Sequence, residues 1–123
     1  MVGLAPGERL VAVRLLAGLA TPFVQLIAEP DVLTLVVPEA DWRELSPAFP
    51  RARRQGPFRV ITFDLDLPAD LVGFLAVVSH ALAGAGVPIL AICGYSKDHV
   101  MVREPDLERA LAAIEALAGT ERQ

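Results

Sequence analysis

The residues best suited to chemistry lie in two segments in the second half of the 123-residue sequence. In the first, two aspartates precede an apolar run, and a glycine falls in the first turn of a predicted helix. Free N–H groups at a helix N-terminus bind carboxylates, and glycine allows a ligand close to the backbone. We therefore predict a ligand site that includes Asp66, Asp70, Leu71, Val72 and Gly73. In the alternative interpretation, Asp70 only caps the helix and Gly73 only permits close packing.

The second segment is a predicted loop between two strands, formed by Gly94, Tyr95, Ser96 and the residues up to Asp98. The carboxylate of Asp98 is suited to accept a charge-assisted hydrogen bond from the ammonium group of an amino acid. Tyr95 offers a ring face and Ser96 a hydroxyl to the same ligand. The alternative is an ordinary turn aspartate that binds its own loop backbone.

Catalytic motifs fit the sequence less well. The stretch FDLDLP at residues 63–68 resembles the nucleophile motif of haloacid-dehalogenase-type phosphatases, but it lies mid-chain, carries a misplaced proline and leaves too little chain for that core. Cys93 and His99 suggest a thiol–imidazole pair, yet nothing orients His99, and a cysteine that ends an apolar strand is usually a small buried hydrophobe. His80 lies opposite the apolar stripe of its helix, as a surface histidine does. We expect no catalytic residue, no cofactor and no metal site.

The elements that must position these residues are clearest in the second half. We predict a strand at residues 58–65 and a helix at 71–85, where apolar residues recur at helical spacing. Next come an all-apolar strand at 87–93, expected to be buried on both faces, and a returning strand at 99–103. A second amphipathic helix begins near Pro105 and ends at Gly119. This order forms most of a ferredoxin-like α/β sandwich of the α+β class, with an antiparallel sheet and helices on one face.

The first half reads as a reduced version of the same unit. We predict an irregular terminus at residues 1–7, a strand at 8–16 and a hairpin of strands at 23–28 and 32–37. Residues 38–57 contain four prolines and several arginines, and we predict a solvated loop with one helical turn near Trp42. The alternative is that these arginines meet a phosphate, an acidic ligand or an acidic partner. The second unit lacks its last strand, and the N-terminal strand is expected to fill that edge.

Residues 63–102 resemble an ACT-type ligand-binding domain, in which a strand ends in Asp and a Gly-containing turn opens a helix that runs to a second Gly. Here these positions are Asp66, Gly73 and Gly86. The run ICGYSKDHVMV at 92–102 is similar to "iStY-x-TDyilV" of small bacterial proteins with two ACT-like units in tandem. Those proteins share this domain type with the eukaryotic cytosolic arginine sensors. The matching residues are Tyr95, Asp98, Val100 and Val102; Cys93 and Gly94 replace the usual Ser-Thr pair.

After the irregular terminus at 1–7, the resemblance implies a degenerate ACT-like unit at 8–57 and a second unit at 58–120. In the first unit, AEPDVLT at residues 28–34 keeps only the acid and the final hydroxyl of the usual "T-x-D/E-L-S" stretch. ACT domains as a class bind amino acids or related small molecules at the strand-to-helix turn. The resemblance therefore implies a non-catalytic regulatory protein that binds an amino acid. The alternative is a ligand-free structural or protein-interaction module with the same fold.

The composition of the chain limits the kinds of partner and ligand that we expect. The net charge of -4 argues against a nucleic-acid partner, and one cysteine with two histidines supplies neither a disulfide framework nor a four-ligand zinc site. No apolar run is long enough to span a membrane, and polar residues interrupt the apolar stretch at 10–28, so we expect a cytoplasmic protein without a membrane partner. Because 54% of residues are hydrophobic in so short a chain, we also expect a homodimer.

Overall fold

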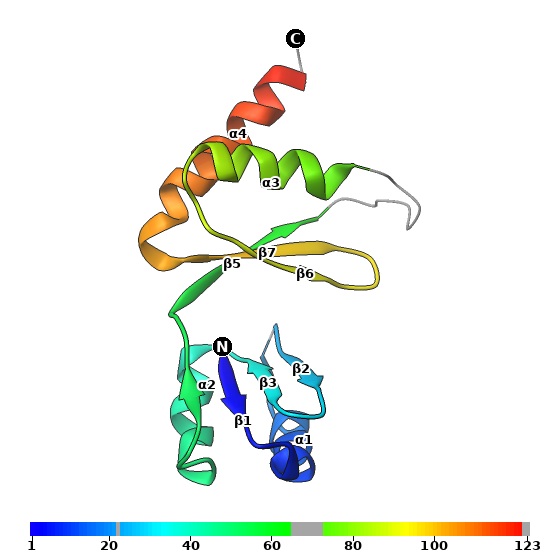
Figure 1. The fold of residues 1–123 in the computed structure, drawn as a ribbon, viewed down its shortest axis with the longest axis vertical. Coiled ribbons are helices and arrows are strands. Elements are labelled where there is room, and N and C mark those ends of the chain that lie inside the picture. Colours follow the sequence, from blue (N-terminus) through cyan, green and yellow to red (C-terminus); the bar gives the residue numbers. More distant parts are fainter. Residues whose placement is uncertain (22, 65–72, 122–123) are drawn as a thin grey trace. The chain divides into compact units, whose positions relative to one another are not determined.

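The computed structural model describes residues 1–21, 23–64 and 73–121 of the chain (Figure 1). The chain divides into two compact units, Met1–Pro57 and Phe58–Gln123. Four of the predicted ligand-binding residues lie outside the described residues: Asp66, Asp70, Leu71 and Val72.

The first unit is a complete β-α-β-β-α-β fold. Its antiparallel sheet has the strand order β2-β3-β1-β4, which is the ferredoxin-like order. The elements are β1 (Val2–Leu4), the 3-10 helix η1 (Pro6–Glu8), α1 (Arg9–Ala17), β2 (Gln25–Ala28), β3 (Leu33–Val36), α2 (Glu39–Leu45), the 3-10 helix η2 (Ser46–Ala48) and β4 (Arg53–Arg54).

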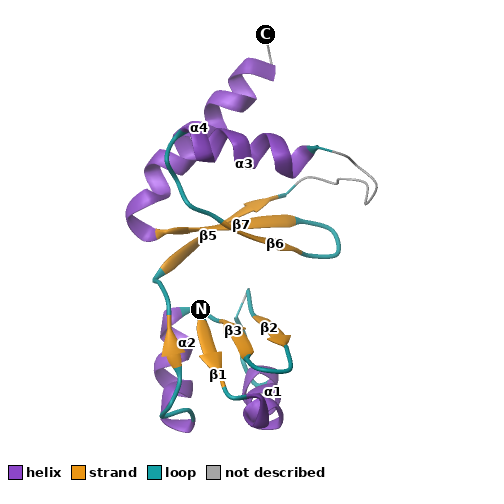
Figure 2. Cartoon of the chain, in the orientation of Figure 1, coloured by secondary structure: helices purple, strands orange, loops and turns teal. Residues whose placement is uncertain are grey.

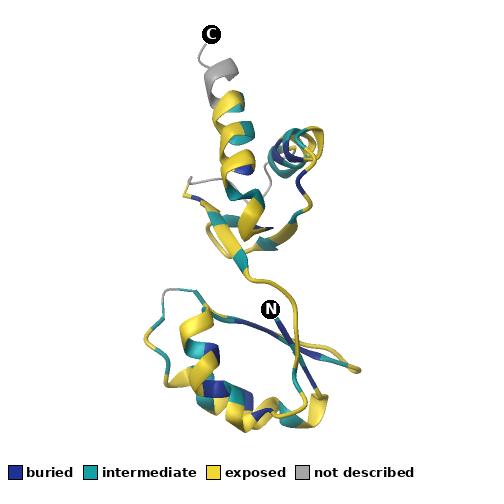
Figure 3. Ribbon diagram, turned by 90° about the vertical axis from the view of Figure 1, so that its left-hand side faces the viewer, coloured by how far each residue is buried: buried dark blue, intermediate teal, exposed yellow. Residues whose placement is uncertain are grey.

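One face of this sheet carries the core of the first unit, because side chains alternate between the two faces of a strand. Val2 and Leu4 of β1 are buried beside Leu33 and Leu35 of β3, and the two helices cover them (Figure 3). The helices and the segment after α2 add Ala12, Leu45 and the stacked rings of Trp42 and Phe49, whose centroids lie 6.1 Å apart.

The second unit has the order β-α-β-β-α. Its antiparallel sheet runs β5-β7-β6, with α3 and α4 over one face (Figure 2). The elements are β5 (Phe58–Phe63), α3 (Phe74–Gly84), β6 (Leu90–Cys93), β7 (Asp98–Arg103), the 3-10 helix η3 (Glu104–Asp106) and α4 (Leu107–Glu121). The core consists of Phe63, Val78, Leu82, Val87, Val100, Val102 and Ala110.

Three predictions for the N-terminal region are wrong. Residues 1–7 are not irregular, because β1 is buried between β3 and β4. The N-terminal strand predicted to complete the second sheet is likewise wrong, because residues 9–17 are helical and β1 is paired on both edges within the first sheet. The strand predicted at 8–16 is the helix α1: Ala12, Leu15 and Leu16 share the face that packs on the core, which is helical spacing.

Two further predictions need correction. The strand at 87–93 is shorter than predicted and is not buried on both faces, because β6 is an edge strand and three of its four residues are exposed. The segment 38–57 is more regular than predicted, since it contains α2, η2 and the last strand of the first sheet. The predicted hairpin of the first unit is confirmed as β2 and β3.

Candidate functional site

The candidate site lies at the end of the second sheet where β5 leaves it. Phe63, the last residue of β5, pairs with Asp98 of β7, which in turn pairs with Cys93 of β6. Residues directly opposite one another on antiparallel strands point to the same face of a sheet. Because Phe63 is buried in the core beneath the helices, the half-buried side chain of Asp98 lies on the helix-covered face.

The first turn of α3 lies at this end of the sheet. The ring of Phe74 packs edge-on against Phe63, with centroids 5.4 Å apart and an interplanar angle of 84°. Figure 1 shows the start of α3, the end of β5 and the β6–β7 turn on the same side of the second unit. The ring contact therefore places the helix N-terminus near the row that contains Asp98.

Gly73 precedes α3 with a φ of +93°, a backbone conformation that favours glycine. Among the described residues, no side chain caps this helix end. The first N–H groups of a helix have no partner within the helix, and they carry a partial positive charge. The site therefore combines donors suited to a carboxylate with a carboxylate suited to an ammonium group.

The β6–β7 turn closes tightly beside this row. The N–H of Gly94 donates to the Lys97 carbonyl oxygen at 2.9 Å, and a Cβ at Gly94 would lie only 3.1 Å from that oxygen. Lys97 Nζ lies 3.4 Å from Asp64 Oδ1, an exposed ion pair worth at most about 1 kcal/mol. Tyr95 and Ser96 are exposed in this turn, and their contact with a ligand remains a prediction.

Asp98 also acts on its neighbour Cys93. The pKa of the Cys93 thiol is raised, mainly by desolvation. The hydrogen bond from the thiol to the Asp98 carboxylate, and the charge of that carboxylate, raise it further. A thiol with a raised pKa is a weak nucleophile at neutral pH. His99 points to the opposite face of the sheet, where its Nδ1 lies 2.9 Å from Thr62 Oγ1, so the two residues do not form a thiol–imidazole pair.

Sequence reasoning selected Gly73, Gly94 and Asp98, and the structure brings all three to one end of the second unit. It missed the roles of Phe63 and Phe74, whose ring contact positions the helix, and the bond between Cys93 and Asp98. That bond is a consequence of hairpin register, because the two residues flank a four-residue turn. The described residues hold no cluster of His, Cys, Asp or Glu arranged for a metal ion.

The comparisons with known proteins agree with this geometry. A family model described as "ACT domain" matches residues 53–116, more than half of the chain. No curated protein matches. Within the described residues, every helix is too short or too polar to span a lipid bilayer.

Solved structures share the fold over almost the whole chain. A Vibrio cholerae protein of unknown function, described as a possible transport protein, is 25% identical with a TM-score of 0.72, covering 95% of this chain and 82% of that one. An Agrobacterium tumefaciens protein is 20% identical with a TM-score of 0.67, covering 94% and 78%. The alpha and beta subunits of an aspartokinase give 16% identity and a TM-score of 0.67, covering 94% and 88%.

These matches confirm the predicted α+β ferredoxin-like architecture, and the family model covers the strand, helix and hairpin that form the candidate site. The chain belongs to the ACT domain family.

Proposed function

We propose that this chain is a non-catalytic regulatory protein that binds a free amino acid at the end of the second sheet. ACT domains are generally small-molecule-binding regulatory domains. In this proposal the ligand carboxylate binds the N–H groups at the start of α3, beside Gly73, and the ligand ammonium binds Asp98. The predicted ligand-binding residues Asp66, Asp70, Leu71 and Val72, which lie between β5 and α3 in the sequence, belong to the proposed site.

The observation that carries the proposal is the placement of Asp98. It is the only acidic residue on the helix-covered side of the described β5–β7–β6 strands, and it shares its row with Phe63, on which the first residue of α3 packs. An amino acid carries two opposite charges a short distance apart. The N-terminus of α3, which no side chain of the described residues caps, and the nearby carboxylate of Asp98 offer the matching pair.

The test is a thermal-shift panel of the full chain against the twenty amino acids at millimolar concentration. Arginine comes first, because the sequence resembles the tandem ACT units related to the eukaryotic arginine sensors. A ligand at 100 times its dissociation constant stabilises the protein by about 2.7 kcal/mol, which raises Tm by several degrees. We expect one or a few amino acids to do so.

The matched variants are Asp98→Asn and Asp31→Asn. Asp31 is an exposed acid in the β2–β3 turn of the first unit, so its removal changes the net charge equally. The shift should disappear in Asp98→Asn and persist in Asp31→Asn. A panel without any shift supports the ligand-free interaction module instead, and a shift that survives Asp98→Asn contradicts the role of Asp98.

We further propose that the two units act as tandem ACT-like units in a cytoplasmic homodimer. Three apolar side chains of α1 support the dimer, because Leu10, Val11 and Val13 are 72%, 48% and 46% exposed. The single unpaired thiol suits the cytoplasm. Sedimentation equilibrium checks the assembly: Leu10→Asp should weaken a dimer that uses this face, and a parent chain that sediments as a monomer contradicts it.

A further inference from the structure

The first sheet has a hollow on the face that its helices do not cover. Strand alternation places Val2 and Leu4 on the core face, so Gly3 between them belongs to the opposite face. Gly3 pairs with Thr34 on one side and with Arg53 on the other. The central position of the row Arg53–Gly3–Thr34 therefore carries no side chain.

A pocket of about 420 Å³ lies at this row, within the range of small-molecule sites. Its lining includes Gly3, Thr34 and both arginines of β4, with Met1, Val32 and Gln55 around them. A Cβ at Gly3 would meet only Val32 Cγ2, at 3.7 Å. The absence of a side chain at Gly3 thus leaves space beside an apolar wall.

The two arginines of β4 differ in their partners. Arg54 Nη2 donates to Glu39 Oε1 of α2 at 2.6 Å, on the helix side of the sheet. Arg53 points to the opposite face, and its guanidinium forms no hydrogen bond or ion pair with any described residue.

The amino group of Met1 also lies at this pocket and donates a hydrogen bond to the Gln55 carbonyl oxygen. Burial, and then the charge of Arg54, lower the pKa of this amino group. The rim of the pocket therefore carries the exposed guanidinium of Arg53 beside the half-buried amino group of Met1.

We propose that this pocket binds a small aliphatic carboxylate. The planar guanidinium of Arg53 pairs with the carboxylate through two hydrogen bonds, and the hydroxyl of Thr34 is available as a further donor. The hydrocarbon part lies over Gly3 against Val32. One guanidinium and one hydroxyl satisfy a singly charged carboxylate, whereas a phosphate has more acceptor oxygens to satisfy.

The experiment is an NMR titration of the full chain with 3-methylbutanoate, followed through the amides of Gly3 and Thr34. The neutral 3-methylbutanamide and inorganic phosphate serve as comparison ligands. We expect saturable shifts with the carboxylate only. Equal shifts with the amide, stronger binding of phosphate, or no saturable shift with the carboxylate overturns the proposal.

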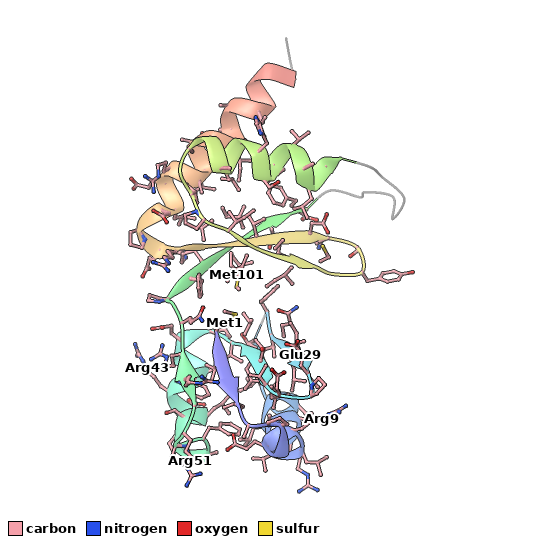
Figure 4. The ribbon with its side chains drawn as sticks, viewed as in Figure 1. Met1, Arg9, Glu29, Arg43, Arg51 and Met101 are labelled. Carbon is pink, nitrogen blue, oxygen red and sulfur yellow. The ribbon has the colours of Figure 1, made fainter. Side chains whose placement is uncertain are left out.

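Variants locate the site. Arg53→Gln and Gly3→Val should each weaken binding of 3-methylbutanoate at least tenfold, the first by removing the cation and the second by filling the hollow. Arg51→Gln is the matched control, since Figure 4 shows Arg51 at the opposite end of the first unit from Met1. Binding that survives Arg53→Gln overturns the proposal even if Gly3→Val fails to fold.

This site is independent of the amino-acid site proposed for the second unit. Asp98→Asn should leave the titration of Gly3 and Thr34 unchanged, and Arg53→Gln should leave the amino-acid thermal shift unchanged. Loss of the 3-methylbutanoate titration in Asp98→Asn would contradict a separate pocket in the first unit.

Discussion

The two units close their hairpins with the same backbone bond but place different side chains beside it. Glu29 N–H donates to Val32 O at 3.0 Å in the first unit, as Gly94 N–H does to Lys97 O in the second. In each unit the next residue pairs with the last residue of the first strand: Leu33 with Leu4, and Asp98 with Phe63. The same position is therefore a sealed core leucine in one unit and a carboxylate in the other.

The surroundings of Leu33 and Asp98 differ as well. In the first unit α1 begins at Arg9, soon after β1, and Leu33 is only 1% exposed. In the second unit residues 64–73 separate β5 from α3. The row that contains Leu33 is therefore apolar and closed, whereas the corresponding row of the second unit contains the half-buried carboxylate of Asp98.

On the sheet faces away from the helices, it is the second unit that is filled and the first unit that has space. Thr62 and His99 fill the second sheet at the position equivalent to Gly3 and Thr34, and their side chains lie 2.9 Å apart. The first sheet has its hollow there instead. The pocket of the first unit therefore lies on the sheet face away from its helices, whereas the acidic residue of the second sheet lies on the helix-covered face.

The largest expected effect comes from moving the carboxylate into the first unit. Leu33→Asp buries an unpaired charge in an apolar core, which should lower the free energy of unfolding of that unit by about 3–5 kcal/mol. Trp42 is the only tryptophan of the chain and lies in this core, so urea unfolding followed by its fluorescence isolates the first unit. Asp98→Leu is the control and should leave the Trp42 transition unchanged; an unchanged transition in Leu33→Asp would show that the two positions do not differ as described.

A smaller effect is expected at the two ends of α3. Gly73→Ala forces a Cβ into a positive-φ conformation and should destabilise the second unit by about 1–2 kcal/mol. Gly84→Ala, where a Cβ meets open space and φ is helical, should instead stabilise it by up to about 1 kcal/mol. Hydrogen exchange of the β7 amides measures both. Equal effects of the two substitutions would mean that Gly73 is not held in this conformation.

The smallest effect concerns the bond between Asp98 and Cys93. The carboxylate helps to raise the pKa of the thiol, so Asp98→Asn should lower that pKa and increase the thiolate fraction at pH 8. Alkylation of the single cysteine by iodoacetamide should then be faster than in the parent chain. Asp64→Asn is the control, because Asp64 pairs with Lys97 and should leave the rate unchanged. A slower reaction in Asp98→Asn would contradict the sign of this interaction.

The second unit could be predicted well because its patterns are local. An apolar stripe and Gly86 define α3, and the short turn after Cys93 sets the register that brings Asp98 beside Phe63. In the first unit, residues 9–17 are apolar on nearly every side, so no stripe distinguishes helix from strand. The choice between helix and strand for these residues depends on their packing against the sheet.

The candidate site of the second unit was visible from residue types, but the hollow of the first was not. Gly3, Thr34 and Arg53 are far apart in the sequence, and only the pairing of β1 with β3 and β4 brings them into one row. The prediction of a loop is wrong at Arg53 and Arg54 for the same reason, because they form a strand and face different sides of it, although both are exposed as predicted.

The interior position of β1 sets the order in which the first unit is completed during synthesis. The β2–β3 hairpin pairs neighbouring residues, whereas β1 needs Leu35 on one side and Arg54 on the other. Contacts so distant in the chain form later, because the intervening loop must close first. A nascent chain that stops before Arg53 has an exposed strand edge open to aggregation. The first sheet is therefore finished only as the chain enters the second unit.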